Sequence, residues 1–192
     1  MTPIPIIYQH PLFSPDTLRK ISDAHQLIHI PKGTYLLKEG QLSMGYHCVE
    51  SGLIRTYALD PNGNDITVDF IGQNEIAIEV VSLFQGVAAK ENIQALTECT
   101  CWYIGYEDFQ KLFHTIEGFT EWGRNWMTQQ LFKVKQRSIS MITESASDRY
   151  ITLQKEHPEI IQQAPLKYIA SFLGITDTSL SRIRAEISKT GT

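Results

Sequence analysis

The stretch APLKYIASFLGITDTSLSRIRAEI, residues 164–187, predicts two short amphipathic helices with a tight turn between them. Pro165 suits the first turn of a helix, because its backbone angle is already helical and it has no amide hydrogen to lose. Gly174 stands where the chain must turn sharply, and Thr176 is a good N-cap for a second helix. The apolar face of that helix follows at spacings of three and four, with Leu180, Ile183 and Ile187.

The offsets within this pair are those of a helix-turn-helix. Ala170 supplies a small residue where the second helix would cross the first closely, and Gly174 follows four residues later. Leu180 and Ile183 then close the small core from the second helix. An ordinary αα-hairpin has the same gross outline and remains the structural alternative. The combined spacing nevertheless favours a pair of helices that reads DNA.

The outward face of the second helix follows from its rotation of about 100° per residue. Asp177 and Thr178 lie at its N-terminal end, which enters the major groove most deeply in such motifs. Arg182 suits a bidentate pair with guanine, and other polar residues suit base edges or phosphates. The candidate contacts to double-stranded DNA are Lys167, Thr176, Asp177, Thr178, Ser181, Arg182, Arg184 and Lys189.

Charge is unevenly distributed along the chain. Residues 1–123 carry a net charge of −8 and residues 124–192 carry +4, against −4 for the whole sequence. The C-terminal part is therefore the place where a polyanion would bind. No run of apolar residues is long enough to cross a membrane, and the N-terminal MTPIPIIYQHPLF is a poor signal peptide. We expect a cytoplasmic protein.

Upstream of the helices, short β-type runs alternate with turn residues. Asn62-Gly63 between two alternating runs is a strong hairpin signal, and several strands at this spacing predict an antiparallel sandwich or barrel. Short helices are expected to begin at residue 15 and to cover 106–114 and 146–155, with a connector between Pro158 and Pro165. The expected strands cover residues 34–38, 46–51, 53–59, 65–71, 92–98 and 100–105.

A long helix is predicted from about residue 118 to residue 143. It carries two apolar stripes, so it needs two partners: its own barrel and the same helix of a second copy. A single wide face packed only on the barrel is the alternative. The residues assigned to a dimer helix are Trp126, Met127, Leu131, Val134 and Met141.

The order of these parts resembles the Crp/Fnr family of bacterial transcription regulators. Residues 147–184 are similar to the form common in Bacteroidetes-type members, and IPKGTYLLKEGQ (30–41) with YHCVESGLIRTY (46–57) is similar to a cyclic-nucleotide-binding-like jelly roll. The resemblance implies an α+β protein with an N-terminal antiparallel β jelly-roll barrel (1–115), a long dimerisation helix (116–144) and a C-terminal helix-turn-helix domain (145–192). It further implies a homodimer on palindromic DNA, contact with RNA polymerase and an unknown small-molecule effector, without enzymatic activity.

The expected effector pocket departs from the nucleotide-binding members. Aligned by that resemblance, Glu79 takes the ribose position, and the phosphate-binding arginine is replaced by Ala89, followed by Lys90. A methyl group cannot bind a phosphate, so we expect cAMP not to be a tight ligand, while a nucleotide or small anion held differently stays open. No wing is expected, because only residues 188–192 follow the second helix.

Metal and haem cofactors are not expected. An iron–sulfur cluster of the kind that the resemblance implies needs cysteines ahead of the barrel, whereas Cys48 is the first cysteine. Cys99 and Cys101 are read as core-facing residues of a strand, and the isolated histidines favour no haem or zinc site. The rival interpretations are a cupin-like enzyme, which lacks its histidine cluster here, and a ligand sensor or interaction protein of this fold whose helical tail does not read DNA.

Overall fold

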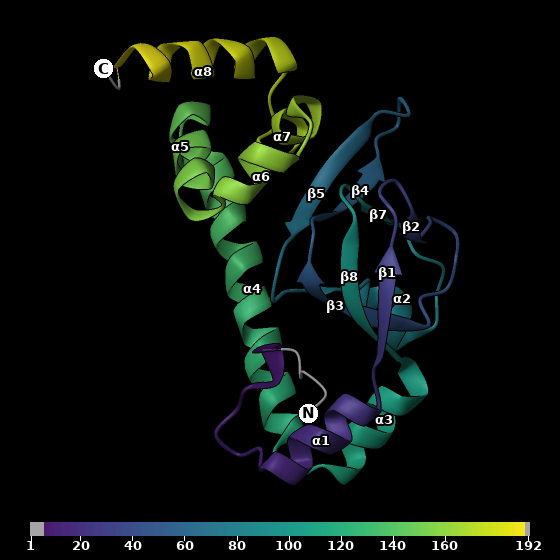
Figure 1. The fold of residues 1–192 in the computed structure, drawn as a ribbon. Coiled ribbons are helices and arrows are strands. Elements are labelled where there is room, and N and C mark those ends of the chain that lie inside the picture. The colour runs from purple at the N-terminus through teal and green to yellow at the C-terminus, as the bar shows by residue number, and fades with distance from the viewer. Residues whose placement is uncertain (1–5, 191–192) are drawn as a thin grey trace.

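The computed structural model describes residues 6–190 of the chain. The predictions about a signal peptide and a wing concern in part residues 1–5 and 191–192, which lie outside this range. The described chain forms a β-barrel, a long helix beside it and a helical unit at one end (Figure 1). In the part that the structure describes, none of the helices is long and apolar enough to cross a membrane.

The barrel consists of two four-stranded antiparallel sheets with strand orders β1-β8-β3-β6 and β2-β7-β4-β5. Asn62-Gly63 lies in the turn of the β4–β5 hairpin, where Leu59 pairs with Asp65, as the sequence predicts. The strands are β1 (Gln26–Ile30), β2 (Tyr35–Leu37), β3 (Gly45–Ser51), β4 (Ile54–Leu59), β5 (Asp65–Ile71), β6 (Ile76–Ala77), β7 (Asn92–Ala95) and β8 (Cys99–Gly105).

Both sheets contribute side chains to the barrel interior. Alternation along each strand sends every second residue inward, and these inward residues are apolar and buried. Cys99 and Cys101 are among them, which confirms that the C-x-C pair is part of the core. The interior cluster is Ile30, Leu37, Val49, Ile54, Ile71, Ala77, Ala89, Ile93, Ala95, Cys99 and Cys101.

A second core lies on the outer face of the first sheet, where several helices cover it. Trp102 and Ile104 of β8 meet aromatic residues from these helices, including Phe119 and Trp122 at the start of the long helix. The covering elements are η1 (Ile6–Tyr8), α1 (Pro15–Asp23), α2 (Val80–Gln85), α3 (Tyr106–Thr115) and α4 (Phe119–Thr143). The barrel and α4 are therefore packed through one continuous apolar cluster.

The C-terminal helical unit, defined here as residues 146–190, has a core of its own that extends onto the barrel. Leu53, Phe70 and Leu96 of the barrel belong to this cluster together with residues of four helices. The expected connector after Pro158 is instead helical, because proline starts a helix readily at its first position. The unit comprises α5 (Ala146–Glu156), α6 (Pro158–Gln163), α7 (Leu166–Phe172) and α8 (Asp177–Thr190).

Candidate nucleic-acid interface and effector site

The turn between α7 and α8 is tightly built. Gly174 has a φ of +69°, a backbone conformation that favours glycine, and its amide donates to Ser171 O over 3.1 Å. The next amide, of Ile175, donates to Ala170 O over 3.0 Å, and Ala170 is fully buried. A Cβ at position 174 would lie 2.7 Å from Met141 Cε, so the turn lies directly against α4. The small residue and the glycine thus occupy the places where the sequence predicts close approach.

Helix α8 begins with a side-chain cap. Thr176 Oγ1 accepts a hydrogen bond from the Ser179 amide over 3.2 Å, which satisfies one of the free amides at the helix start. Leu180 is fully buried and Ile183 is 9% exposed, and both pack in the core of the C-terminal helical unit. One face of α8 is therefore fixed against α7 and its neighbours.

The opposite face of α8 is open to solvent. Helix α8 lies across the end of the molecule farthest from α1 and α3 (Figure 1), where a long partner can approach it. Lys167 on α7 is also exposed, with its Nζ 4.8 Å from the centre of the Tyr168 ring. The predicted residues exposed on or before α8 are Thr176, Asp177, Thr178, Ser181, Arg182, Arg184 and Lys189.

A buried arginine joins the barrel to α7. Arg55 on β4 is 1% exposed, and its guanidinium lies between the rings of Tyr57 and Tyr168, at 4.1 and 3.4 Å. Its Nη2 donates to Asp65 Oδ2 over 3.1 Å, and its Nη1 donates to Thr67 Oγ1 over 3.4 Å. The charge is thus balanced by one carboxylate and two aromatic faces. Sequence reasoning did not identify this contact.

Two further contacts fix α7 on the β4–β5 hairpin. Ser171 Oγ donates to Thr67 Oγ1 over 2.9 Å, and the Thr67 amide donates to Ser171 Oγ over 3.1 Å. Arg137 on α4 donates to Val68 O over 2.6 Å and to Phe172 O over 3.0 Å. Because Arg137 touches both partners, α4, β5 and α7 meet at a single side chain.

Helix α4 has an apolar face that the described chain leaves largely exposed, although Met141 near its end packs against Gly174 in the α7–α8 turn. The exposed fractions of Met127, Leu131 and Val134 are 55%, 65% and 64%, and Met141 is 40% exposed. Trp126 differs, because it is only partly exposed and packs on the cluster that covers the first sheet. We therefore correct its assignment: Trp126 faces the barrel of its own chain. Sequence reasoning missed further exposed apolar residues of α4, namely Phe132, Ile139 and Ile142.

The effector position predicted from the sequence is acidic and closed. Glu79 is 8% exposed, and its carboxylate caps α2 by accepting from the Ser82 amide. Ala89 is 3% exposed and belongs to the interior core, whereas Lys90 points to solvent. Burial raises the pKa of the nearby Glu91, and the charges of Glu79 and Asp69 raise it further. The three predicted residues thus present no cation toward a buried phosphate.

The cysteines and other metal-binding side chains show no metal centre within residues 6–190. No group of three His, Cys, Asp or Glu side chains in that range is placed to hold a metal ion. Burial raises the pKa of the Cys101 thiol to about 12, so that it stays protonated and unreactive at neutral pH. These cysteines act as core residues.

The barrel has the fold of a cyclic nucleotide-binding domain, and residues 27–115 match the family model of that domain. A transcriptional regulator of the Crp/Fnr family from Eubacterium rectale superposes with a TM-score of 0.72 at 20% identity, covering 95% of this chain and 88% of its own. No curated protein matches the chain significantly.

Two further solved structures share this fold over most of the chain. The c-di-GMP-responsive global regulator CLP of Xanthomonas campestris has a TM-score of 0.72 at 16% identity, covering 93% of each chain. The catabolite activator protein of Thermus thermophilus has a TM-score of 0.60 at 16% identity, covering 96% of this chain and 87% of its own. At these identities the likeness establishes the fold, which this chain shares with transcription regulators of the Crp/Fnr type.

Proposed function

We propose that this protein is a sequence-specific DNA-binding transcription regulator that acts as a homodimer. The observation that carries the proposal is the geometry of α7 and α8: the second helix is capped at Thr176, buried on Leu180 and exposed along its opposite polar face. A helix held in this way can enter a major groove without unfolding its own core. The Crp/Fnr-type fold supports the same function.

In the proposed complex, α8 reads bases and its surroundings bind phosphates. Arg182 pairs with a guanine edge, while Thr178 and Ser181 contact base edges or phosphates. Lys167, Arg184 and Lys189 neutralise phosphates, which supplies affinity without sequence preference. We assign base contacts to exposed side chains on the outward face of α8 and phosphate contacts to those at its flanks.

A second copy of the chain is the proposed partner of α4. Met127, Leu131 and Val134 expose a large apolar surface along a 25-residue helix, and such a surface is typical of an interaction site. Pairing of two α4 helices would place two α8 helices on successive half-sites, about 34 Å apart. RNA polymerase as a further partner and a Bacteroidetes-type origin stay predictions from the resemblance, and a cytoplasmic location stays a prediction from the sequence.

The proposed effector is not cAMP. A cyclic phosphate near Ala89 would be placed beside Glu79 and Glu91 without a buried cation to balance its charge, and burying an unpaired charge is costly. Titration calorimetry with the purified chain should give no saturable heat with cAMP in the micromolar range. Micromolar binding of cAMP would show that the acidic segment rearranges to accept it.

Selection from random DNA duplexes at low salt tests the regulator proposal directly. The expected result is enrichment of a two-fold symmetric sequence whose half-sites are separated by about one helical turn. Recovery of duplexes without any common sequence would contradict it and would favour the interaction protein whose helical tail does not read DNA. Chemical cross-linking of the same protein–DNA sample shows whether the protein bound to the duplex is a dimer.

A further inference from the structure

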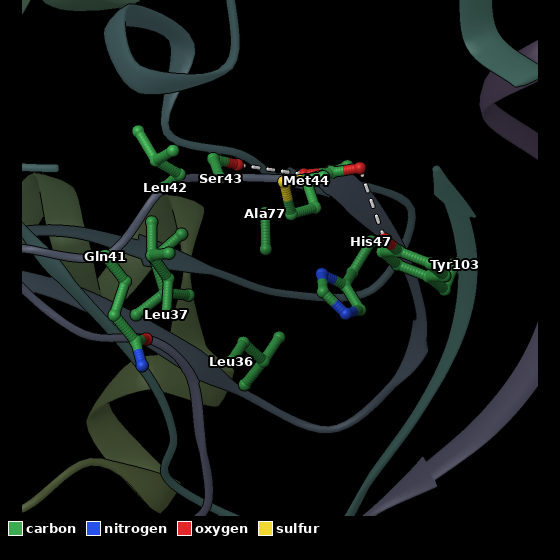
Figure 2. Close-up of a pocket in the computed structure, with 11 residues that line it drawn as sticks. Leu36, Leu37, Gln41, Leu42, Ser43, Met44, His47, Ala77 and Tyr103 are labelled. Atoms are coloured by element: carbon green, nitrogen blue, oxygen red, sulfur yellow. Dashed lines mark hydrogen bonds between the residues drawn. The ribbon is translucent and has the colours of Figure 1, made fainter. Parts of the chain in front are cut away.

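A pocket of about 490 Å³ lies at the edge of the barrel interior and is open to solvent on one side. Leu37, Ala77 and Ile93 of the packed interior cluster form part of its wall. Its walls come from β2, β3, β6, β7 and β8, and its rim is the loop between β2 and β3 (Figure 2). This volume lies in the range of about 300–1,000 Å³ that is typical of small-molecule sites.

The walls of this cavity are mainly apolar and carry no charge. The apolar lining residues are Leu36, Leu37, Leu42, Met44, Ala77 and Ile93. Among the described residues that line it, there is no lysine, arginine, aspartate or glutamate. A charged molecule would therefore lose its hydration without gaining an ionic partner. Leu42 and Met44 at the rim are 53% and 68% exposed, which leaves an unusual amount of apolar surface around the opening.

Of the described residues that line the cavity, only His47 and Tyr103 carry ionisable side chains. Its imidazole packs against the Tyr103 ring, with 4.9 Å between ring centres, and projects toward Leu36 and Ala77 in Figure 2. Tyr103 already donates its hydroxyl hydrogen to Met44 O, and Ser43 donates to Gly45 O. Burial lowers the pKa of His47 to about 4, so the ring is neutral at pH 7 and offers one donor and one acceptor.

We propose that this cavity binds a small, uncharged and mostly aromatic or aliphatic molecule whose single polar group forms a hydrogen bond with His47. An aromatic alcohol has the required chemistry: its ring matches the apolar walls, and its hydroxyl can pair with an imidazole nitrogen. Glu79, Ala89 and Lys90, which take the ribose and phosphate positions of the resembling family, do not line this pocket. The pocket adjoins that position, since Ala89 packs in the same cluster as Leu37, Ala77 and Ile93.

The rim of the cavity is hydrogen-bonded to that other segment. The Gly40 amide donates to Ala89 O, and the Ala89 amide donates to Gln41 O, both over 2.8 Å. The Ser43 amide donates to Ser82 Oγ over 2.8 Å, and Ser82 belongs to α2. A molecule that moves the rim therefore also moves the segment from α2 to Ala89.

Binding of 1-naphthol to the full chain, measured by calorimetry and by naphthol fluorescence, tests this site without DNA. Naphthalene serves as the matched probe without the hydroxyl, and 1-naphthoate as the matched anion. We expect saturable binding of 1-naphthol, about tenfold weaker binding of naphthalene, which is the size of one net hydrogen bond, and no detectable binding of naphthoate. Absence of saturable naphthol binding, or naphthoate binding as tight as that of naphthol, would overturn the proposal.

Variants locate the site. His47→Phe should lower the naphthol affinity about tenfold and leave naphthalene binding unchanged, whereas His47→Gln, which keeps hydrogen-bonding groups, should retain the preference for naphthol. Ala77→Leu should weaken both probes by filling the cavity, and His29→Phe, at an exposed histidine on β1, should change neither. Equal naphthol binding by wild type, His47→Phe and Ala77→Leu would place the probe elsewhere and refute the site. Because no DNA is present, the outcome is independent of the proposed regulator function.

Discussion

The guanidinium carbon of Arg55 lies 3.4 Å from the centre of the Tyr168 ring, which places a barrel arginine under the first helix of the α7–α8 pair. Arg55 is buried and Tyr168 covers it, so the orientation of α7 depends directly on the β4–β5 hairpin. Helix α8 follows the turn at Gly174, so its orientation depends on that of α7. The barrel therefore determines where the exposed face of α8 points.

Asp65→Asn should destabilise the protein by about 2–3 kcal/mol, because it leaves the buried Arg55 without its carboxylate. Asp65 is 35% exposed and is easily solvated as an amide, whereas Arg55, at 1%, cannot regain water. Urea unfolding at pH 7 provides the measurement. Asp108→Asn is the matched control: it breaks an exposed ion pair with Lys111 and should change little. Equal effects of the two substitutions would show that Arg55 does not need its partner.

Leu180→Ala should cost about 2–4 kcal/mol of stability in the C-terminal helical unit, since it opens a cavity under α8. The side chain is fully buried, whereas the neighbouring Ser181 is exposed. Ser181→Ala is therefore the control and should unfold at the wild-type urea concentration. Hydrogen exchange of α7 and α8 amides would localise the loss. If the Leu180 variant were as stable as the control, the packing of α8 on α7 would be wrong.

Arg182→Ala should relax sequence preference at one base position of each half-site and cost about 1–3 kcal/mol of binding there. Lys167→Ala, in contrast, should weaken binding to every sequence alike and reduce the dependence of affinity on salt. Both are measured by fluorescence anisotropy on the selected duplex and its single-base variants. An Arg182 variant that keeps the wild-type preference at all positions would exclude the proposed docking.

Leu131→Asp should raise the dimer dissociation constant at least tenfold, because it places a charge in the apolar face of α4 that pairs in the proposed dimer. Gln129→Asp is the control: it changes an exposed polar residue of the same helix that lies outside the apolar face, and it should leave the dimer dissociation constant unchanged. Sedimentation velocity over a range of concentrations distinguishes the two. A dimer that survives Leu131→Asp must use another surface.

Much of the fold follows from local patterns in the sequence. The β4–β5 hairpin, the long helix α4 and the α7–α8 pair are predicted with bounds close to those observed, because alternation, periodicity and turn residues are local signals. Strand β6 was missed because it has only two residues. Helix α2 was missed because its sequence VVSLFQ favours a strand by composition. Its capping by Glu79 becomes evident only in three dimensions.

The candidate sites also contain residues that local patterns predict and residues that only the three-dimensional packing reveals. The exposed face of α8 follows from helix geometry alone, so its residues could be named from the sequence. The contact of Arg55 with Tyr168 could not, because an arginine in a strand is normally assigned to solvent and Tyr168 lies on α7, far away in the sequence. The side of α4 that Trp126 occupies could have been predicted, because Trp126 lies four and seven residues after Trp122 and Phe119, which pack toward the barrel.

Arg137 has a consequence for how the barrel and the C-terminal helical unit can move relative to each other. Its guanidinium donates to Val68 O of β5 and to Phe172 O of α7, while its backbone belongs to α4. Any displacement of β5 must either carry α7 along or break the bonds at Arg137 together with the Thr67–Ser171 contacts. Packed contacts of this kind switch between discrete arrangements and do not deform gradually. The coupling between barrel and α8 therefore has a limit: while these bonds hold, α7 and α8 move together with β5, and only a shift large enough to break several bonds at once lets α8 change its position relative to the barrel.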